Sequence, residues 1–114
     1  MSSMPSAPSA ECTVVVPVYR NAGNIAPLLA RLGELHARVP GGIELVFVVD
    51  GSPDDSHARL AAALPSQAFA AQLLLLSRNF GSFAAIREGL SVVRTPFSAV
   101  MAADLQEPIE LIEQ

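Results

Sequence analysis

The sequence contains no lysine and no tryptophan, and it has only one cysteine and one tyrosine. All seven basic residues are arginines, which form no basic run, and eleven acidic residues give a net charge of −4. A protein that binds nucleic acid through its phosphates needs a positively charged face, so we expect no nucleic-acid partner. Because Cys12 is alone, an internal disulfide and a cysteine zinc cluster are excluded, and a reducing, cytoplasmic compartment fits best.

Long hydrophobic runs are also missing. The longest apolar segments, residues 14–18, 45–49 and 73–76, are far shorter than the roughly 20 residues that a membrane-spanning helix needs. Residues 1–11 are rich in Ser, Ala and Pro and lack the basic start and the apolar stretch of a signal peptide, so we expect a flexible tail. The chain as given is therefore predicted to be soluble.

The composition is nevertheless that of a folded domain. Hydrophobic residues make up 51% of the 114 residues and charged residues 16%, which is too apolar a balance for a disordered chain. This length suits one domain at most. We expect that domain to span residues 12–114.

From residue 12 onward, short apolar segments alternate with longer segments of helical period. Four strands are predicted, at residues 13–18, 43–49, 73–76 and 97–102. Residues 45–49 of the second are apolar without a break, which is typical of a strand buried on both faces of a parallel sheet. The alternation predicts an α/β domain in which helices flank a parallel sheet.

The segments between the strands carry helix signals. After the first strand, apolar residues at positions 25, 28, 29, 32 and 35 share one helical face, and Asn24 can cap that helix. A second helix is expected to open at a capping Ser52 followed by Pro53.

Two further helices are predicted nearer the carboxyl end of the chain. One begins near Ser82 and is expected to bury a face formed by Phe83, Ile86, Leu90 and Val93. The other would start at Glu107 and Pro108.

Polar residues follow every predicted strand. In a parallel sheet the carboxyl ends of the strands meet at one edge, and ligands bind in the crevice beyond that edge. The residues expected there are Tyr19, Arg20, Asn21, Asp50, Gly51, Ser52, Ser77, Arg78, Asn79, Asp104, Leu105 and Gln106. Two carboxylates, two arginines and several amides at one edge indicate a site for a polar ligand that carries phosphate and needs a metal.

The same residues also have structural interpretations. Asp50 before Gly51 is either a turn residue or part of the site, and Asp104 is either a solvated loop acid or a ligand-binding residue. Arg78 and Asn79 either satisfy the end of a strand or bind a ligand. The sequence alone leaves these alternatives open.

Other candidates are weaker. Asp54 and Asp55 are expected to be acids at the start of a helix, where they favour the helix dipole. His36 and His57 have no second ligand at metal-binding spacing, so we expect surface histidines. The sequence has no Walker pattern, no three-glycine dinucleotide fingerprint and no serine nucleophile elbow.

Four segments, in this order, resemble the inverting family 2 glycosyltransferases, in particular the polyprenyl-phosphate (dolichol-phosphate mannose synthase-like) branch. The segments are VVVPVYRN at 14–21, VVDGS at 48–52, LSRNFG at 76–81 and ADLQEP at 103–108. The last two point to the polyprenyl-phosphate branch. The resemblance covers residues 13–114.

The resemblance implies a GT-A type, Rossmann-like domain that binds a nucleotide-diphospho-sugar donor. It implies that Pro17, Tyr19 and Asp50 line the nucleoside pocket. Arg78 and Asp104 would also bind the nucleotide-sugar. The implied acceptor is a lipid phosphate, such as polyprenyl phosphate, at the membrane surface.

The resemblance also implies a divalent metal, Mg²⁺ or Mn²⁺. Asp104 and Gln106 match the family's metal and diphosphate motif, and the cation would offset the charge that develops on the leaving diphosphate. That motif usually has two aspartates flanking one residue, whereas here Ala102 takes the first place, so one carboxylate remains. Ser82 stands where many relatives have Lys or His, and Val49 where many have a second aspartate.

The family fold continues beyond the part that this sequence resembles. We expect residues 12–114 to be the amino-terminal, donor-binding half, truncated after the fourth β/α unit and without a catalytic residue of its own. An unpaired sheet edge next to residues 97–102 would then favour self-association. A longer form would be associated with the membrane.

Two functions of other classes compete with this interpretation. One is a non-catalytic nucleotide-binding or partner-binding module derived from the same fold, which Ala102 and the missing half favour. The other is a phosphoacceptor signalling domain, which has a similar α/β alternation. The lack of lysine argues against the latter, because such domains use a lysine to sense the phosphoryl group.

Overall fold

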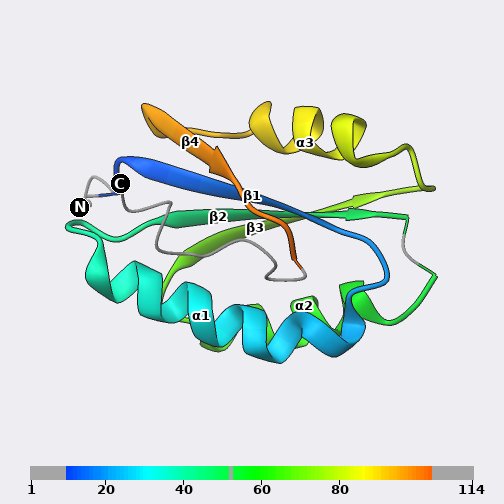
Figure 1. Ribbon diagram of the computed structural model, residues 1–114, viewed down its shortest axis with the longest axis horizontal. Helices are drawn as coiled ribbons and strands as arrows, with labels where there is room; N and C mark the ends of the chain where they lie inside the picture. The colour runs from blue at the N-terminus through cyan, green and yellow to red at the C-terminus, as the bar shows by residue number, and fades with distance from the viewer. Residues whose placement is uncertain (1–9, 52, 104–114) are drawn as a thin grey trace, which may run out of the picture.

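The computed structural model describes residues 10–51 and 53–103. Within these residues a sheet is formed by the parallel strands β1 (Cys12–Val18), β2 (Glu44–Asp50), β3 (Ala70–Leu76) and β4 (Phe97–Val100). Their order in the sheet is β3-β2-β1-β4. Helices cover both faces (Figure 1), so the expected α/β fold with a parallel sheet and flanking helices is confirmed.

Some expectations fall outside the described residues. They concern the tail at residues 1–9, the helix cap at Ser52, the metal motif at Asp104 and Gln106, and the helix start at residues 107–108.

The helices are divided between the two faces of the sheet. Helices α1 (Ile25–Arg38) and α2 (Ser56–Ala63) lie on one face, and α3 (Ser82–Leu90) lies on the other (Figure 1). Short 3₁₀ turns precede α1 (Ala22–Asn24) and follow α2 (Leu64–Ser66). The chain runs from β1 through β2 to β3 and then returns through α3 to β4, on the other side of β1. The strand order therefore reverses between β1 and β4, which is where open α/β sheets bind ligands.

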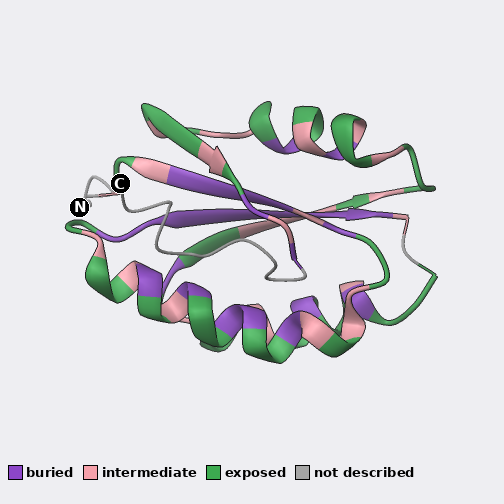
Figure 2. Ribbon diagram, viewed as in Figure 1, coloured by how far each residue is buried: buried purple, intermediate pink, exposed green. Residues whose placement is uncertain are grey.

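The two central strands supply much of the core. Every residue of β2 is buried, as the apolar run at 45–49 predicted, and the buried residues include Glu44 and Asp50 at its two ends. Figure 2 shows burial concentrated in β1 and β2. Successive residues of a strand point to opposite faces. Val14 accordingly packs in the same cluster as Leu28 of α1, whereas Val15 packs with Ala85 of α3.

The predicted buried face of the third helix is wrong at Phe83 and Leu90, whereas Ile86 and Val93 are half-buried. Phe83 is 90% exposed and Leu90 42% exposed, whereas Ala85 and Gly89 are buried. A Cβ atom on Gly89 would lie 2.5 Å from Cγ1 of Val15, so the helix axis runs very close to the sheet. Helix α3 therefore makes its closest contact with the sheet through small residues, and its Phe83 and Leu90 are exposed.

The start of the second helix also differs from the prediction. Helix α2 begins at Ser56 with Asp55 as its N-cap residue. Asp54 precedes the helix, and its Oδ1 accepts hydrogen bonds from the N–H and the hydroxyl of Ser56 at 3.1 and 2.6 Å. Its Oδ2 accepts the N–H of Ala22 at 3.2 Å. Asp54 therefore connects the start of α2, through hydrogen bonds, to the segment that follows β1.

The ends of two strands shift as well. Strand β3 begins at Ala70 instead of residue 73, because β2 offers parallel partners as far back as Glu44. Strand β4 ends at Val100, two residues earlier than predicted. Asn24 occupies the N-cap position of α1 but makes no capping hydrogen bond with its side chain.

His36 is not the surface histidine that the sequence suggested. It is half-buried, and its Nδ1 accepts the N–H of Ile43 at 3.0 Å. Its ring lies edge-on to Phe69, with 6.2 Å between the ring centroids. His36 thus ties α1 to the start of β2, a structural role that helical spacing does not reveal.

Candidate functional site

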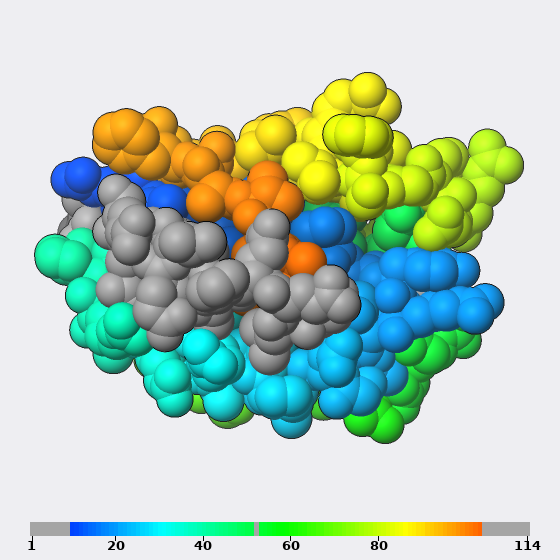
Figure 3. Space-filling model, in the orientation of Figure 1, coloured from blue at the N-terminus to red at the C-terminus, as the bar shows by residue number. Residues whose placement is uncertain are grey.

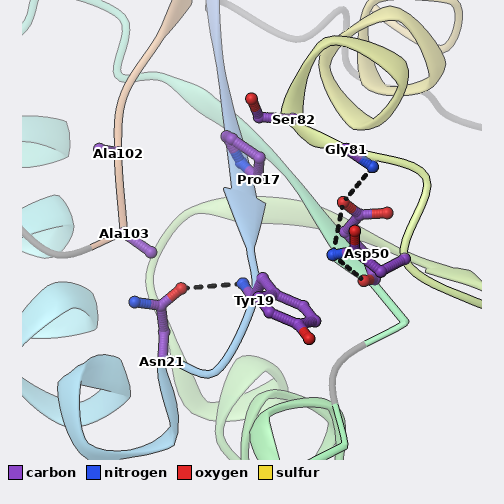
Figure 4. A pocket seen from close by; sticks show the side chains of 9 residues that line it. Pro17, Tyr19, Asn21, Asp50, Gly81, Ser82, Ala102 and Ala103 are labelled. Atoms are coloured by element: carbon purple, nitrogen blue, oxygen red, sulfur yellow. Dashed lines mark hydrogen bonds between the residues drawn. The ribbon is translucent and has the colours of Figure 1, made fainter.

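A pocket of about 480 Å³ lies beyond the carboxyl ends of the strands, where the strand order reverses. We call the residues that line it the wall residues; they are Pro17, Tyr19, Asn21, Asp50, Asn79, Gly81, Ser82, Ala102 and Ala103. They lie at the ends of β1 and β2, in the segments that follow β1, β3 and β4, and at the start of α3. Figure 4 shows Pro17 and Tyr19 at the end of β1, between Asp50 and Gly81 on one side and Ala102 and Ala103 on the other.

Pro17 helps to open this pocket at the end of β1. Met101 donates its N–H to the carbonyl of Val15 at 3.0 Å, so the backbone polar groups of Val15 face the β4 side of the strand. Pro17, two residues on, faces the same side but lies past the last paired residue of β4. Its missing N–H therefore breaks no hydrogen bond of the sheet, and the space beside it stays open.

Tyr19 and Asn21 form the next part of the wall. The N–H of Tyr19 donates to Oδ1 of Asn21 at 2.9 Å, which closes a tight turn after β1 (Figure 4). The buried Ser56 supports this turn, because its hydroxyl oxygen accepts the N–H of Asn21 at 3.2 Å. Tyr19 is 39% exposed, and the Arg20 guanidinium lies 5.4 Å from the centroid of its ring.

Asp50 is the one charged wall residue, and it is only 3% exposed. Its Oδ1 accepts the N–H of Phe80 at 2.8 Å, and its Oδ2 accepts the N–H of Gly81 at 3.0 Å. The side-chain amide of Asn79 adds a hydrogen bond to Oδ2 at 3.3 Å and another to the Asp50 carbonyl at 3.3 Å. The carboxylate thus holds the segment that leads into α3.

The residue after Asp50 strengthens this connection. Gly51 has φ +63°, and a Cβ atom there would overlap the backbone of Arg78 and Asn79. Only glycine allows this backbone conformation and this close approach together. The ends of β2 and β3 are therefore packed against each other backbone to backbone.

Arg78 lies outside the pocket wall. Its guanidinium carbon is 4.8 Å from the centroid of the Phe80 ring, an arrangement typical of a cation–π contact. Of the residues that the resemblance implied for the donor, the structure brings Pro17, Tyr19 and Asp50 together around one pocket. Asp104 lies outside the described residues.

Asn21 and Asn79, which the sequence placed in the crevice beyond the strands, line the same pocket. Gly81 and Ser82 line it too, although the sequence indicated no part in binding for either. Their position between the end of β3 and the start of α3 is the signal that could have identified them.

The described wall residues carry one carboxylate and no cationic side chain. Among the described residues, no group of three His, Cys, Asp or Glu side chains could hold a metal ion. A ligand with a diphosphate would therefore find no positive charge on this part of the wall. A divalent cation next to the pocket would supply it, and Asp104 directly follows the wall residue Ala103 in the sequence.

The one thiol lies at the other end of β1 from the pocket. Cys12 begins that strand, and burial raises the pKa of its thiol. A raised pKa keeps the thiol protonated near neutral pH, and the protonated form is a poor nucleophile. The structure therefore gives Cys12 no chemical role in the pocket.

No helix in the described part of the chain has both the length and the apolar character that a membrane crossing requires.

Comparison with known proteins gives one family. The family model described as Glycosyl transferase family 2 matches residues 13–114. An undecaprenyl-phosphate 4-deoxy-4-formamido-L-arabinose transferase of Pseudomonas aeruginosa is 36% identical over 100 residues, which are 88% of this chain and 30% of the relative. The enzyme of the same name from Sodalis glossinidius is 35% identical over 100 residues, 88% of this chain and 31% of the relative.

A relative with another name matches over a similar length. The dodecaprenyl-phosphate galacturonate synthase of Rhizobium johnstonii is 32% identical over 98 residues, which are 86% of this chain and 29% of the relative. The chain thus spans about a third of the length of these curated relatives.

Proposed function

This chain belongs to glycosyl transferase family 2, and we propose that its pocket binds the nucleotide part of a nucleotide-diphospho-sugar donor. One observation carries the proposal: Pro17, Tyr19 and Asp50, from two of the four family-like segments, line a single pocket where the strand order reverses. Its volume of about 480 Å³ is within the usual range for small-molecule sites. Tyr19, being partly exposed, offers a ring face against which a base can stack.

We propose that a divalent cation, Mg²⁺ or Mn²⁺, accompanies the donor. The described wall has one carboxylate and no cationic side chain, so a divalent cation would add positive charge beside a bound diphosphate. Asp104 and Gln106 would hold the cation, together with phosphate oxygens and water, which suits a Mg²⁺-like ion because it keeps several waters. The bound cation would stabilise the charge on the departing diphosphate.

The proposed acceptor is a lipid phosphate such as polyprenyl phosphate. The relatives' names specify undecaprenyl phosphate and dodecaprenyl phosphate. We propose that residues 12–114 form the donor-binding half of such a transferase and that the longer protein works at a membrane surface. Because positioning of both substrates contributes many orders of magnitude to rate, the 114-residue chain alone should not transfer sugar.

Calorimetry tests the binding proposal directly. Uridine and guanosine diphosphates are titrated into the 114-residue chain with Mn²⁺ and, separately, with a chelator. We expect weak binding of at least one nucleotide that depends on the metal. No heat and no NMR chemical-shift change with either nucleotide at millimolar concentration would contradict the proposal. Robust sugar transfer to polyprenyl phosphate by this chain would contradict the proposal that it forms only the donor-binding half of a transferase.

A second candidate function is a non-catalytic module that binds a nucleotide or a partner. Ala102 favours it, since this wall residue stands where the family motif usually has an aspartate. In that case nucleotide binding should be independent of Mn²⁺, and the titration with and without chelator separates the two candidates.

A further inference from the structure

Strand β3 forms one edge of the described sheet and has none of the features that usually protect an edge. Among the described strands it pairs with β2 alone. Its seven residues pair without a bulge and include no proline, and residues 60–77 contain no charged side chain. Natural sheets commonly block an edge with a charge, a proline, a bulge or a very short strand. Strand β3 is therefore a long edge that can accept another strand.

An apolar pocket of about 400 Å³ lies beside this edge. It is lined by Ala71 and Leu73 of β3 and by Ala61, Leu64 and Pro65, which lie in α2 and in the turn after it. These five residues have no polar side-chain atom. The pocket is therefore suited to an apolar side chain that arrives from outside the edge.

Leu75 is an apolar side chain that the described residues leave uncovered, because it is 57% exposed. Successive residues of a strand point to opposite faces of the sheet. Leu73 packs in the same cluster as Leu60 of α2, whereas Leu74 packs with Ala85 of α3. Leu75 therefore lies on the same face of the sheet as Leu73 and the apolar pocket.

We propose that β3 pairs with β3 of a second copy of this chain, antiparallel and around a twofold axis at Leu73. Pairing along the whole strand fixes the register, so that Leu73 lies opposite its own counterpart and Ala71 lies opposite the Leu75 of the other copy. Opposed residues share a face of the sheet, with Cβ atoms about 4.5–5.5 Å apart. Each Leu75 then reaches the apolar pocket of the other copy, beside Ala71.

The distribution of charge favours a second copy over a charged partner. Each chain has a net charge of −4, so two copies repel each other where acidic surfaces meet. Residues 60–77 carry no charge that would repel a second copy or attract a charged peptide. A twofold interface brings the same surface of both copies together, so the exposed leucine and the pocket of each copy are both filled. The edge is complementary to itself in charge and in shape, independently of the proposed nucleotide site.

Disulfide cross-linking tests the register. Cys12→Ser removes the natural thiol, and either Leu73→Cys or Ala71→Cys is added to that chain. The two thiols at position 73 would face each other across the axis, whereas the two at position 71 would be about 14 Å apart, because four residues of strand separate them. A disulfide needs Cα atoms within about 7 Å. We expect a disulfide-linked dimer after mild oxidation with Leu73→Cys and none with Ala71→Cys, and any other pattern would overturn the proposal.

Sedimentation equilibrium distinguishes this edge from the opposite edge of the sheet. The starting chain carries Phe97→Lys, because a charge next to β4 hinders pairing there. We expect this chain to form a dimer, and the addition of Leu75→Lys to weaken dimerisation at least tenfold, since the charge would lie at an apolar pocket. Leu90→Lys is the matched control, at a leucine of α3 that is 42% exposed, and should leave the dimer unchanged.

A starting chain that stays monomeric at every concentration would overturn the proposal, because the edge would then require another occupant. Equal effects of Leu75→Lys and Leu90→Lys would overturn it too. The two measurements use different variants of β3, so that each decides alone where a variant of the other does not fold.

Discussion

The backbone of Gly51 lies directly against the backbone of Arg78, with no space for a side chain between them. Gly51 follows β2 and Arg78 follows β3, so this contact joins the ends of two neighbouring strands. Asp50 holds the same segment through hydrogen bonds to Phe80 and Gly81. One side of the pocket is therefore built by packing and by hydrogen bonding together.

Gly51→Ala tests the packing part of this connection. The methyl group would overlap the backbone of Arg78, and alanine is disfavoured at φ +63°. We expect the free energy of unfolding to fall by about 2 kcal/mol or more, measured by urea denaturation. Gly23→Ala is the control, because no atom lies within 4 Å of its added Cβ, and it should change stability by less than about 0.5 kcal/mol. Equal effects of the two variants would show that the contact is not tight.

Gly89→Ala tests the close packing of α3 on the sheet. The new Cβ would lie 2.5 Å from Cγ1 of Val15 and 3.0 Å from Cγ2 of Val48, so the helix must shift outward. We expect a loss of about 1–3 kcal/mol in the free energy of unfolding. In Gly33→Ala, on α1, the added Cβ meets no atom within 4 Å, and the better helix propensity of alanine should raise stability by about 0.5–1 kcal/mol. The same substitution thus has opposite signs in two helices, and equal signs would count against the packing of α3.

Ala102→Asp tests the proposed metal site. It places a second carboxylate on the pocket wall, near the position proposed for the cation. With Mn²⁺ present, attraction to the cation should exceed the desolvation cost and tighten binding of a nucleoside diphosphate by about 1 kcal/mol, or about fivefold. Without metal, the added charge faces the diphosphate and should weaken binding or leave it unchanged.

Calorimetry with Mn²⁺ and with chelator measures both effects. Ala58→Asp, at an exposed position of α2, controls for the added negative charge. Affinities that do not depend on the metal in either the unaltered chain or Ala102→Asp would show that this strand end is not a metal site.

The side of the molecule formed by β4 and α3 carries uncovered apolar residues. Among the described strands β4 pairs only with β1, and its Phe97 is 65% exposed, while Phe83 of α3 is almost fully exposed. Figure 3 shows β4 and α3 next to each other along the upper side of the molecule. Exposed apolar edges favour pairing with another chain, so we expect self-association through β4.

Light scattering over a range of protein concentrations measures this association. Phe97→Lys should reduce it, since it removes apolar surface and places a charge next to the edge strand. Ala26→Lys, at an exposed position of α1, should leave it unchanged. A monomer at every concentration would contradict the expectation.

The sequence by itself determined the strands and their parallel arrangement. Residues 14–16 of β1 and residues 45–49 of β2 are apolar and rich in β-branched residues. The helical segments between the strands serve as the crossover connections that parallel strands require. The same alternation of strands and helices predicted that Tyr19 lies just beyond β1 and that Asp50 lies at the end of β2. These features depend on residues close together in the sequence, which is why local patterns reveal them.

Only the tertiary structure decided which groups meet. Helical spacing placed Phe83 and Leu90, together with Ile86 and Val93, on the buried face of α3. Phe83 and Leu90 are exposed and Ala85 and Gly89 are buried, because the distance between helix and sheet depends on side-chain size across the contact. The pattern could not show that Asp50 binds the backbone of Phe80, thirty residues away. A hydrogen bond between distant segments depends on how two loops pack in space, and hydrophobic periodicity carries no information about that packing.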